Sequence, residues 1–112
     1  MRPEEVLCLF PDGIRYRWRE VAEQAEKLQE IRLRAGMPLS VWIGNRERFV
    51  DTQGRIVDRP EKAARAASGE LEDLLKHLCR YSVYAFADEI RQGFLTVQGG
   101  HRIGVAGQVI LD

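Results

Sequence analysis

Arginine is the residue type in this sequence with the clearest capacity for chemistry. Of the 17 basic residues all but three are arginine, whose guanidinium group forms paired hydrogen bonds with phosphate or carboxylate oxygens. Arg32 and Arg34 share one face of a predicted strand with Glu30, and Arg102 begins another predicted strand directly after Gly99-Gly100. These arginines are candidates for binding an anion, although arginines on a strand are commonly solvated or paired with a carboxylate.

A glycine-rich segment, residues 98–107, has the composition of a phosphate-binding loop but lacks its spacing. Such a loop needs the pattern G-x-x-x-x-G-K-[ST], and no lysine follows Lys76. Gly99-Gly100 instead predicts a tight hairpin turn, and Gly104 and Gly107 predict a bulge or a close approach of the backbone to a partner. The G-x-x-G spacing of these last two glycines also occurs in RNA-binding KH loops, but here no helices flank it.

The remaining reactive side chains do not converge on a site. Cys8, His77, Cys79 and His101 lack the paired spacing of a zinc site, so we expect no metal. Asp88-Glu89 are adjacent and point apart on a helix, which does not suit general acid-base catalysis. The sequence therefore predicts no catalytic residue and no cofactor within this chain.

The composition predicts one globular domain. A chain of 112 residues is long enough for one hydrophobic core and too short for two. Hydrophobic residues make up 45% and charged residues 30%, a balance typical of folded rather than disordered proteins. Because Lys and Arg together number 17 and so do Asp and Glu, the net charge is zero and exerts no general attraction on nucleic acid or lipid.

The sequence also favours a soluble protein of a reducing compartment. The longest uncharged stretch, residues 103–111, is too short to cross a bilayer, and the N-terminus lacks the apolar core of a signal peptide. Cys8 and Cys79 each sit among apolar neighbours, as buried free thiols do. We expect a cytoplasmic protein, and the apolar run that ends at Asp112 indicates a chain cut from a longer one.

Hydrophobic periodicity predicts the elements of the first half of the chain. Spacing of three and four indicates helices, and alternation indicates strands separated by glycine and proline turns. The predicted elements are a short helix from Pro3, an amphipathic helix from about Tyr16 to Leu28, strands around Ile31–Arg34 and Leu39–Ile43, and short strands at Arg48–Asp51 and Arg55–Asp58.

The second half is predicted to contain helices followed by a hairpin. Residues 58–69 have the composition of a linker. Ser68 then caps a helix whose apolar face consists of Leu71, Leu74, Leu75 and Leu78. A second helix with Val83, Phe86, Ala87 and Ile90 ends at Gly93, and strands follow at Phe94–Gln98 and Arg102–Leu111.

Four blocks of sequence can be compared with a known family. They are Leu28–Leu39, Leu78–Phe86, Asp88–Phe94 and Thr96–Gly107, and in this order they resemble the N-terminal region of the stage III sporulation protein AA family. The resemblance covers about residues 28–111. The family comprises ATPases of endospore-forming bacteria that are related to secretion and pilus-retraction motors and are thought to act on the mother-cell side of the channel to the forespore.

The resemblance implies a fold. The phrase Ile31–Pro38 is similar to the N-terminal domain of type II and type IV secretion and pilus ATPases, a PAS-like sheet with helices on one face. We therefore expect a single α+β domain in which an antiparallel, PAS-like sheet packs against helices. Residues 1–28 would be a helical segment packed on it, residues 29–112 the secretion-ATPase-type domain, and the P-loop ATPase domain would lie beyond residue 112.

The resemblance also implies a function for the chain as a contact domain. It would join its own P-loop domain and neighbouring subunits of a hexamer in an ATPase that energises the mother cell to forespore channel. This piece would not be an enzyme, whereas the full-length protein would use ATP and Mg. Arg102, and secondarily Arg32 and Arg34, would reach the nucleotide, as arginines of the related motors do.

The same comparison implies where such a protein acts. It would lie in the mother-cell cytoplasm, held at the membrane by a membrane protein of the sporulation channel, with no direct contact to nucleic acid. The alternative is a small nucleic-acid-binding module that uses the arginine-bearing strand face. A small catalytic domain is a third possibility, but it lacks a convergent acid, base and nucleophile.

Overall fold

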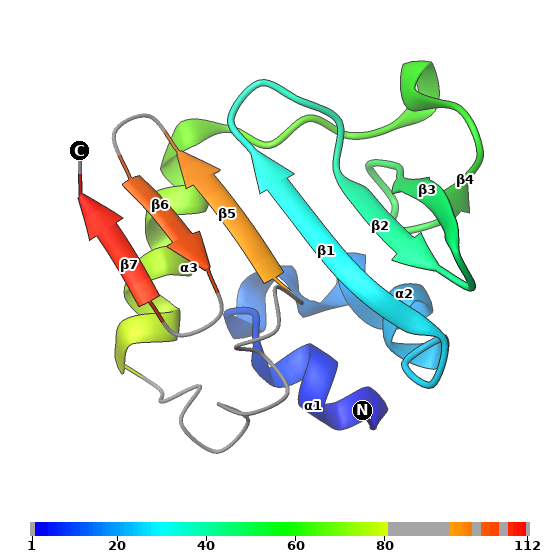
Figure 1. The fold of residues 1–112 in the computed structure, drawn as a ribbon, viewed down its shortest axis with the longest axis horizontal. Helices are drawn as coiled ribbons and strands as arrows, with labels where there is room; N and C mark the ends of the chain where they lie inside the picture. Colours follow the sequence, from blue (N-terminus) through cyan, green and yellow to red (C-terminus); the bar gives the residue numbers. More distant parts are fainter. Residues whose placement is uncertain (1, 81–94, 100–101, 106–107, 112) are drawn as a thin grey trace.

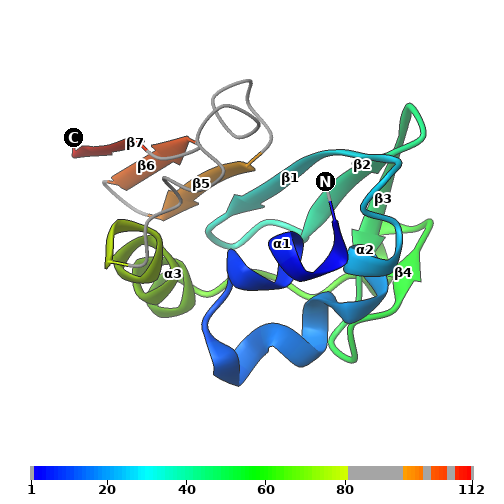
Figure 2. The ribbon, with the colours of Figure 1, turned by 90° about the horizontal axis from the view of Figure 1, so that it is seen from below.

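The fold is a mixed sheet with helices packed on one of its faces (Figures 1 and 2). The computed structural model describes residues 2–80, 95–99, 102–105 and 108–111. Within them the sheet has seven strands in the order β4-β3-β2-β1-β5-β6-β7. The predicted α+β class is confirmed. The strands are β1 (Leu28–Arg34), β2 (Ser40–Ile43), β3 (Arg46–Val50), β4 (Ile56–Val57), β5 (Leu95–Gly99), β6 (Arg102–Val105) and β7 (Gln108–Leu111).

One strand pair is parallel, so the expectation of an antiparallel sheet is wrong. β1 and β5 run in the same direction, with Ile31 opposite Leu95 and Arg34 opposite Gln98, while the other neighbours are antiparallel. Parallel neighbours need a long crossover connection, and the chain that contains α3 (Ser68–Arg80) lies between these strands in sequence. The crossover brings β5 to the centre of the sheet beside β1.

The short helix predicted from Pro3 forms, whereas the longer helix predicted from about Tyr16 to Leu28 does not. Pro3 occupies the first turn of α1, and the backbone N–H of Arg2 donates to Glu5 Oε1 at 2.8 Å, which caps this helix. In place of one helix over 16–28, a 3₁₀ helix and a single α-helical turn precede a bend into β1. Besides α3, the helical segments of the described residues are α1 (Pro3–Cys8), η1 (Asp12–Trp18), α2 (Arg19–Glu23) and the 3₁₀ turn η2 (Pro60–Lys62).

One hydrophobic cluster joins these helices, the covered face of the sheet and α3. The rings of Phe10 and Trp18 stack with centroids 4.3 Å apart and planes 5° from parallel. The apolar stripe predicted for α3 is buried as expected, and each of its leucines is at most 9% exposed. The cluster includes Val6, Leu9, Phe10, Trp18, Val21, Ile31, Leu33, Val41, Leu71, Leu74, Leu75, Leu78, Leu95 and Val97.

The segment predicted as a linker, residues 58–69, packs against the sheet. Ala64 and Ala66 are buried, and their carbonyls accept hydrogen bonds from Leu39 N at 2.9 Å and Gly36 N at 2.8 Å. The amide of Ala64 donates to Val50 O at 2.8 Å. Backbone hydrogen bonds therefore fasten this segment between the β1–β2 turn and the end of β3.

The C-terminal hairpin forms, but the last predicted strand is divided. Gly99 pairs with Arg102 across β5 and β6, as a tight turn requires, and the chain reverses again before β7. Gly104 pairs with Val97 and Val109 in continuous register, so the bulge predicted at this position is wrong. Gly100, Gly107 and the predicted helix that ends at Gly93 lie outside the described residues.

Candidate functional site

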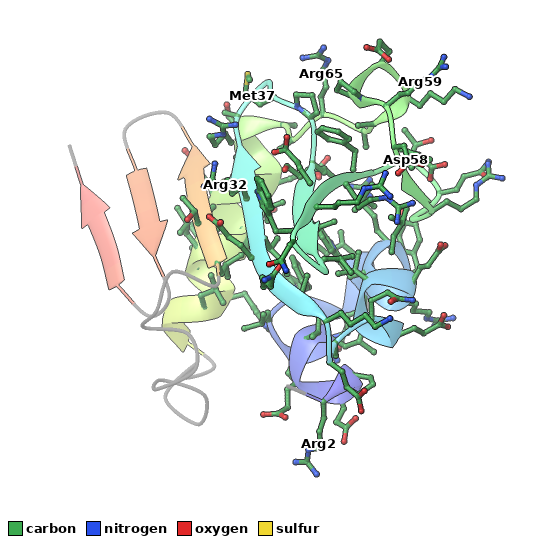
Figure 3. The ribbon with its side chains drawn as sticks, turned by 45° about the vertical axis from the view of Figure 1, so that its right-hand side comes forward. Arg2, Arg32, Met37, Asp58, Arg59 and Arg65 are labelled. Carbon is green, nitrogen blue, oxygen red and sulfur yellow. The ribbon has the colours of Figure 1, made fainter. Side chains whose placement is uncertain are left out.

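Helices α1, α2 and α3 lie on one face of the sheet (Figure 2), and the burial pattern of β1 places its arginines on the opposite face. Ile31 and Leu33 enter the core, whereas Glu30, Arg32 and Arg34 alternate with them and are half-buried. Figure 3 shows Arg32 extending from the middle of β1. Alternation along the strand thus places these charges on one outer face.

Arg32 is held by a carboxylate of the same face. Its Nε donates to Glu30 Oε1 at 2.6 Å. The hydrogen bond and charge of Glu30, with a smaller contribution from Glu47 on β3, raise the pKa of Arg32 above its ordinary value. Ser40 lies between these groups on β2 and donates its hydroxyl to Glu47 Oε2 at 2.7 Å. An incoming anion would have to displace Glu30 to reach Arg32.

Arg34 is the candidate of β1 that keeps an unused donor. It is the last residue of the strand, and its Nε is buried without a hydrogen-bond partner in the described part of the chain. Unlike Arg32, this guanidinium makes no ion pair among the described residues that an incoming anion would have to displace. Of the two arginines on β1, Arg34 is therefore better placed to bind an anion than Arg32.

The backbone position of Arg102 is on the opposite face of the sheet from Arg34. Arg34 lies beside Gln98, and Gln98 pairs with Ile103, so position 103 shares the face of Arg34. Arg102 pairs with Gly99 and belongs to the alternate set of positions. The candidate arginines therefore do not form one cluster, but Arg34 and Arg102 share one end of the sheet.

Two residues of this face were not identified from the sequence. Trp42, opposite both Glu30 and Glu47, is half-buried, and its indole Nε1 is buried with no hydrogen-bond partner among the described residues. The second is Glu47, whose negative charge contributes to raising the pKa of Arg32. The alternation of Ser40 and Trp42 in β2 could have placed Trp42 on this face, but only the strand register reveals which charges meet. The mixed charge weakens the case for a nucleic-acid surface here.

A small pocket lies between η1 and the start of α3. Arg17 Nη1 contacts Glu70 Oε2 at 3.0 Å, and Arg17 Nε is buried with no partner within the described ranges. The pocket volume is about 20 Å³, which suits one water molecule and excludes an organic ligand. Its walls include Phe10, Trp18, Leu33, Leu71 and Leu74.

The cysteine and histidine predictions have mixed outcomes. Cys8 is exposed, so its expected burial is wrong, because α1 turns this position outward while Val6 and Leu9 face the core. His77 Nε2 lies 3.0 Å from Cys8 O and joins α3 to the end of α1. His101, the carboxylates at 88 and 89 and the side chain of Cys79 lie outside the described residues.

Neither a metal cluster nor a membrane span is present in the described parts of the chain. No three or more His, Cys, Asp or Glu side chains among those residues are grouped so that they could hold a metal ion. Within the same ranges, none of the helices combines the length and the apolar character that crossing a bilayer demands.

Comparison with known proteins assigns the chain to a family. Stage III sporulation protein AA of Bacillus subtilis (strain 168) is 27% identical over an aligned region that covers 96% of this chain and 32% of that protein. The chain thus spans about a third of the length of the curated relative that it matches. No solved structure matches. The sequence model described as Sporulation stage III, protein AA matches residues 1–112, and the chain therefore belongs to this family.

Proposed function

We propose that the chain is the N-terminal contact domain of a sporulation ATPase related to secretion motors. Family membership supports a role in sporulation. In the proposal the chain packs against its own P-loop domain and against neighbouring subunits of a hexamer, which bind ATP and Mg. The longer protein acts in the mother-cell cytoplasm, beside a membrane protein of the channel.

The observation that carries the proposal is the position of two arginines at one end of the sheet. Arg34 ends β1 beside Gln98, and Arg102 begins β6 beside Gly99, the last residue of β5. A guanidinium group stays charged and meets phosphate oxygens in a paired geometry, so it can offset the charge that develops during phosphoryl transfer. This end of the sheet is therefore the edge that faces nucleotide in the proposal.

The surroundings of Arg32 and Arg34 support an order between these two second choices. Arg32 already donates to Glu30 at 2.6 Å and experiences the charge of Glu47, so a phosphate gains little there. Arg34 has an unused buried donor in the described part of the chain. We rank Arg102 first, Arg34 second and Arg32 third.

Replacing Arg102 in the full-length protein tests this function. Arg102→Ala is expected to lower ATP turnover about a hundredfold or more, the size of arginine-finger effects, because the transition-state charge loses its partner. The melting temperature of the isolated chain carrying the same change should stay nearly constant. Arg19→Ala removes an exposed arginine from α2 and serves as the matched control.

Two results would contradict the proposal. Full ATP turnover in the Arg102→Ala protein would remove this arginine from the nucleotide site. A large fall in the melting temperature of the isolated chain would instead give Arg102 a structural role. Turnover measured at saturating ATP separates a defect in the chemical step from one in binding.

A further inference from the structure

A rim of basic side chains with one exposed methionine borders one end of the molecule. We define this basic rim as Met37, Arg59, Lys62 and Arg65. Met37 lies in the turn between β1 and β2 with 43% of its surface exposed, and the three basic residues are exposed along the segment that contains η2. Figure 3 shows Met37, Arg65 and Arg59 along the same upper margin, directed away from the sheet.

The backbone holds the rim in place. Met37 N donates to Arg34 O at 2.9 Å, and Met37 O accepts from Ala66 N at 3.2 Å. Arg65 Nη1 donates to Gly36 O at 2.7 Å, and Arg65 forms an antiparallel bridge with Pro38. An apolar side chain is thus presented on a fixed turn beside a cation, rather than on a free terminus.

The charge of the rim is not balanced locally. In the described residues Arg59, Lys62 and Arg65 form no ion pair with a carboxylate, and Glu61 is the single acid between them in sequence. The nearby Asp58 is already bound by Arg46 and Arg48. The net charge of the chain is zero, so the excess of positive charge at this end is a property of the surface and not of the composition.

We propose that the basic rim docks on the surface of an anionic lipid bilayer. Arginine and lysine meet lipid phosphates, while the thioether chain of Met37 enters the boundary between headgroups and acyl chains. Charge complementarity selects an anionic surface, and the outward apolar side chain favours a bilayer over an acidic protein segment. The proposal rests on side chains other than Arg34 and Arg102, although the rim adjoins the proposed nucleotide edge, because Met37 N donates to Arg34 O at 2.9 Å.

Co-sedimentation of the chain with vesicles tests the proposal. The chain should sediment with vesicles of phosphatidylglycerol and phosphatidylcholine in equal parts at low salt, and not with phosphatidylcholine alone. Binding should weaken as salt screens the charges. Arg59→Glu with Lys62→Glu should lower the partition coefficient at least about tenfold, since each basic residue near such a surface contributes separately.

A matched variant controls for net charge. Arg19→Glu with Lys27→Glu makes the same change of charge at exposed positions in and after α2, and it should bind the vesicles as the unchanged chain does. Met37→Ser should weaken binding without altering its salt dependence. Circular dichroism of each variant verifies folding.

Three outcomes would overturn the inference. The first is no sedimentation of the unchanged chain with anionic vesicles at low salt. The second is an equal loss of vesicle binding in the matched control, which would mean that binding depends on the net charge of the chain and not on the basic rim. The third is unchanged binding by Met37→Ser together with tight binding to polyglutamate, which would assign the rim to an acidic protein.

Discussion

Arg32 illustrates how neighbours decide what a charged residue can do. One of its carboxylate neighbours, Glu30, lies two positions away on the same strand and is visible in the sequence. The other, Glu47, comes to the same face only because Trp42 on β2 pairs with both Glu30 and Glu47. An arginine that already donates to one carboxylate and experiences the charge of a second is a poor ligand for a further anion.

Gly54 occupies a turn where the backbone of another element leaves no room for a side chain. Although burial raises the pKa of Asp51, the backbone N–H groups of Arg55 and Gln53 donate to its carboxylate and lower that pKa below its ordinary value. The resulting turn presents Gly54, at a φ of 85°, to the backbone of Arg17. The turn between β3 and β4 is thereby packed on η1.

Gly54→Ala should destabilise the fold by about 2 kcal/mol or more. A Cβ at this position would lie 2.7 Å from Arg17 O and 2.9 Å from Arg17 Cα, and the positive φ adds a further cost of about 1 kcal/mol. Gly13→Ala is the matched control, because nothing lies within 4 Å of its Cβ position. Urea unfolding of both variants measures the difference. Equal stability of the two would mean that the turn does not rest on η1.

Local patterns located most elements but not their extent or their partners. Alternation predicted the strands near Ile31 and Leu39, and the leucine spacing predicted α3, because both signals are contained within one segment. The predicted helix over 16–28 is divided because tertiary contacts override the local pattern. Trp18 stacks on Phe10, and Gly44 N donates to Lys27 O, which turns the chain into β1.

Strand pairing was the part of the fold that local pattern could not supply. In the sequence β5 is separated from β1 by three strands and by α3, and no local pattern indicates that the two strands are parallel neighbours. The same limit applies to the candidate site. The arginines were identified by type and alternation, whereas the opposite faces of Arg34 and Arg102 follow from register alone.

Leu74→Ala should cost about 2 to 5 kcal/mol of unfolding free energy. Leu74 is 2% exposed in the middle of α3, and it already borders the small pocket beside Arg17, so truncation enlarges an existing void. Lys76→Ala, at an exposed position of the same helix, should change stability by less than about 0.5 kcal/mol. Thermal unfolding of both variants provides the comparison. A small effect of Leu74→Ala would remove α3 from the cooperative core.

The charged groups of the molecule differ in balance from one surface to another. On the outer face of the sheet Arg32 is paired with Glu30, whereas the basic rim carries unbalanced positive charge. The nucleotide edge of the proposal lies where β1 and β5 end, and it adjoins the rim, because Met37 N donates to Arg34 O at 2.9 Å. The rim and the proposed nucleotide edge are thus neighbouring parts of one end of the sheet, and such an end suits a domain whose proposed work is contact rather than turnover.

The isolated chain should neither hydrolyse ATP nor bind it tightly. Its sequence contains no G-x-x-x-x-G-K-[ST] pattern, so it cannot form the backbone cradle and lysine contact that a phosphate loop provides. An arginine at the end of a strand offers one charged contact to a nucleotide, and a single contact does not offset the entropic and desolvation costs of binding ATP. Isothermal titration with Mg and ATP should show no saturable heat, and phosphate release should equal that of buffer. Sustained turnover by the purified chain, abolished by a point substitution within it, would show that the chain contains a catalytic site of its own and would contradict the contact-domain proposal.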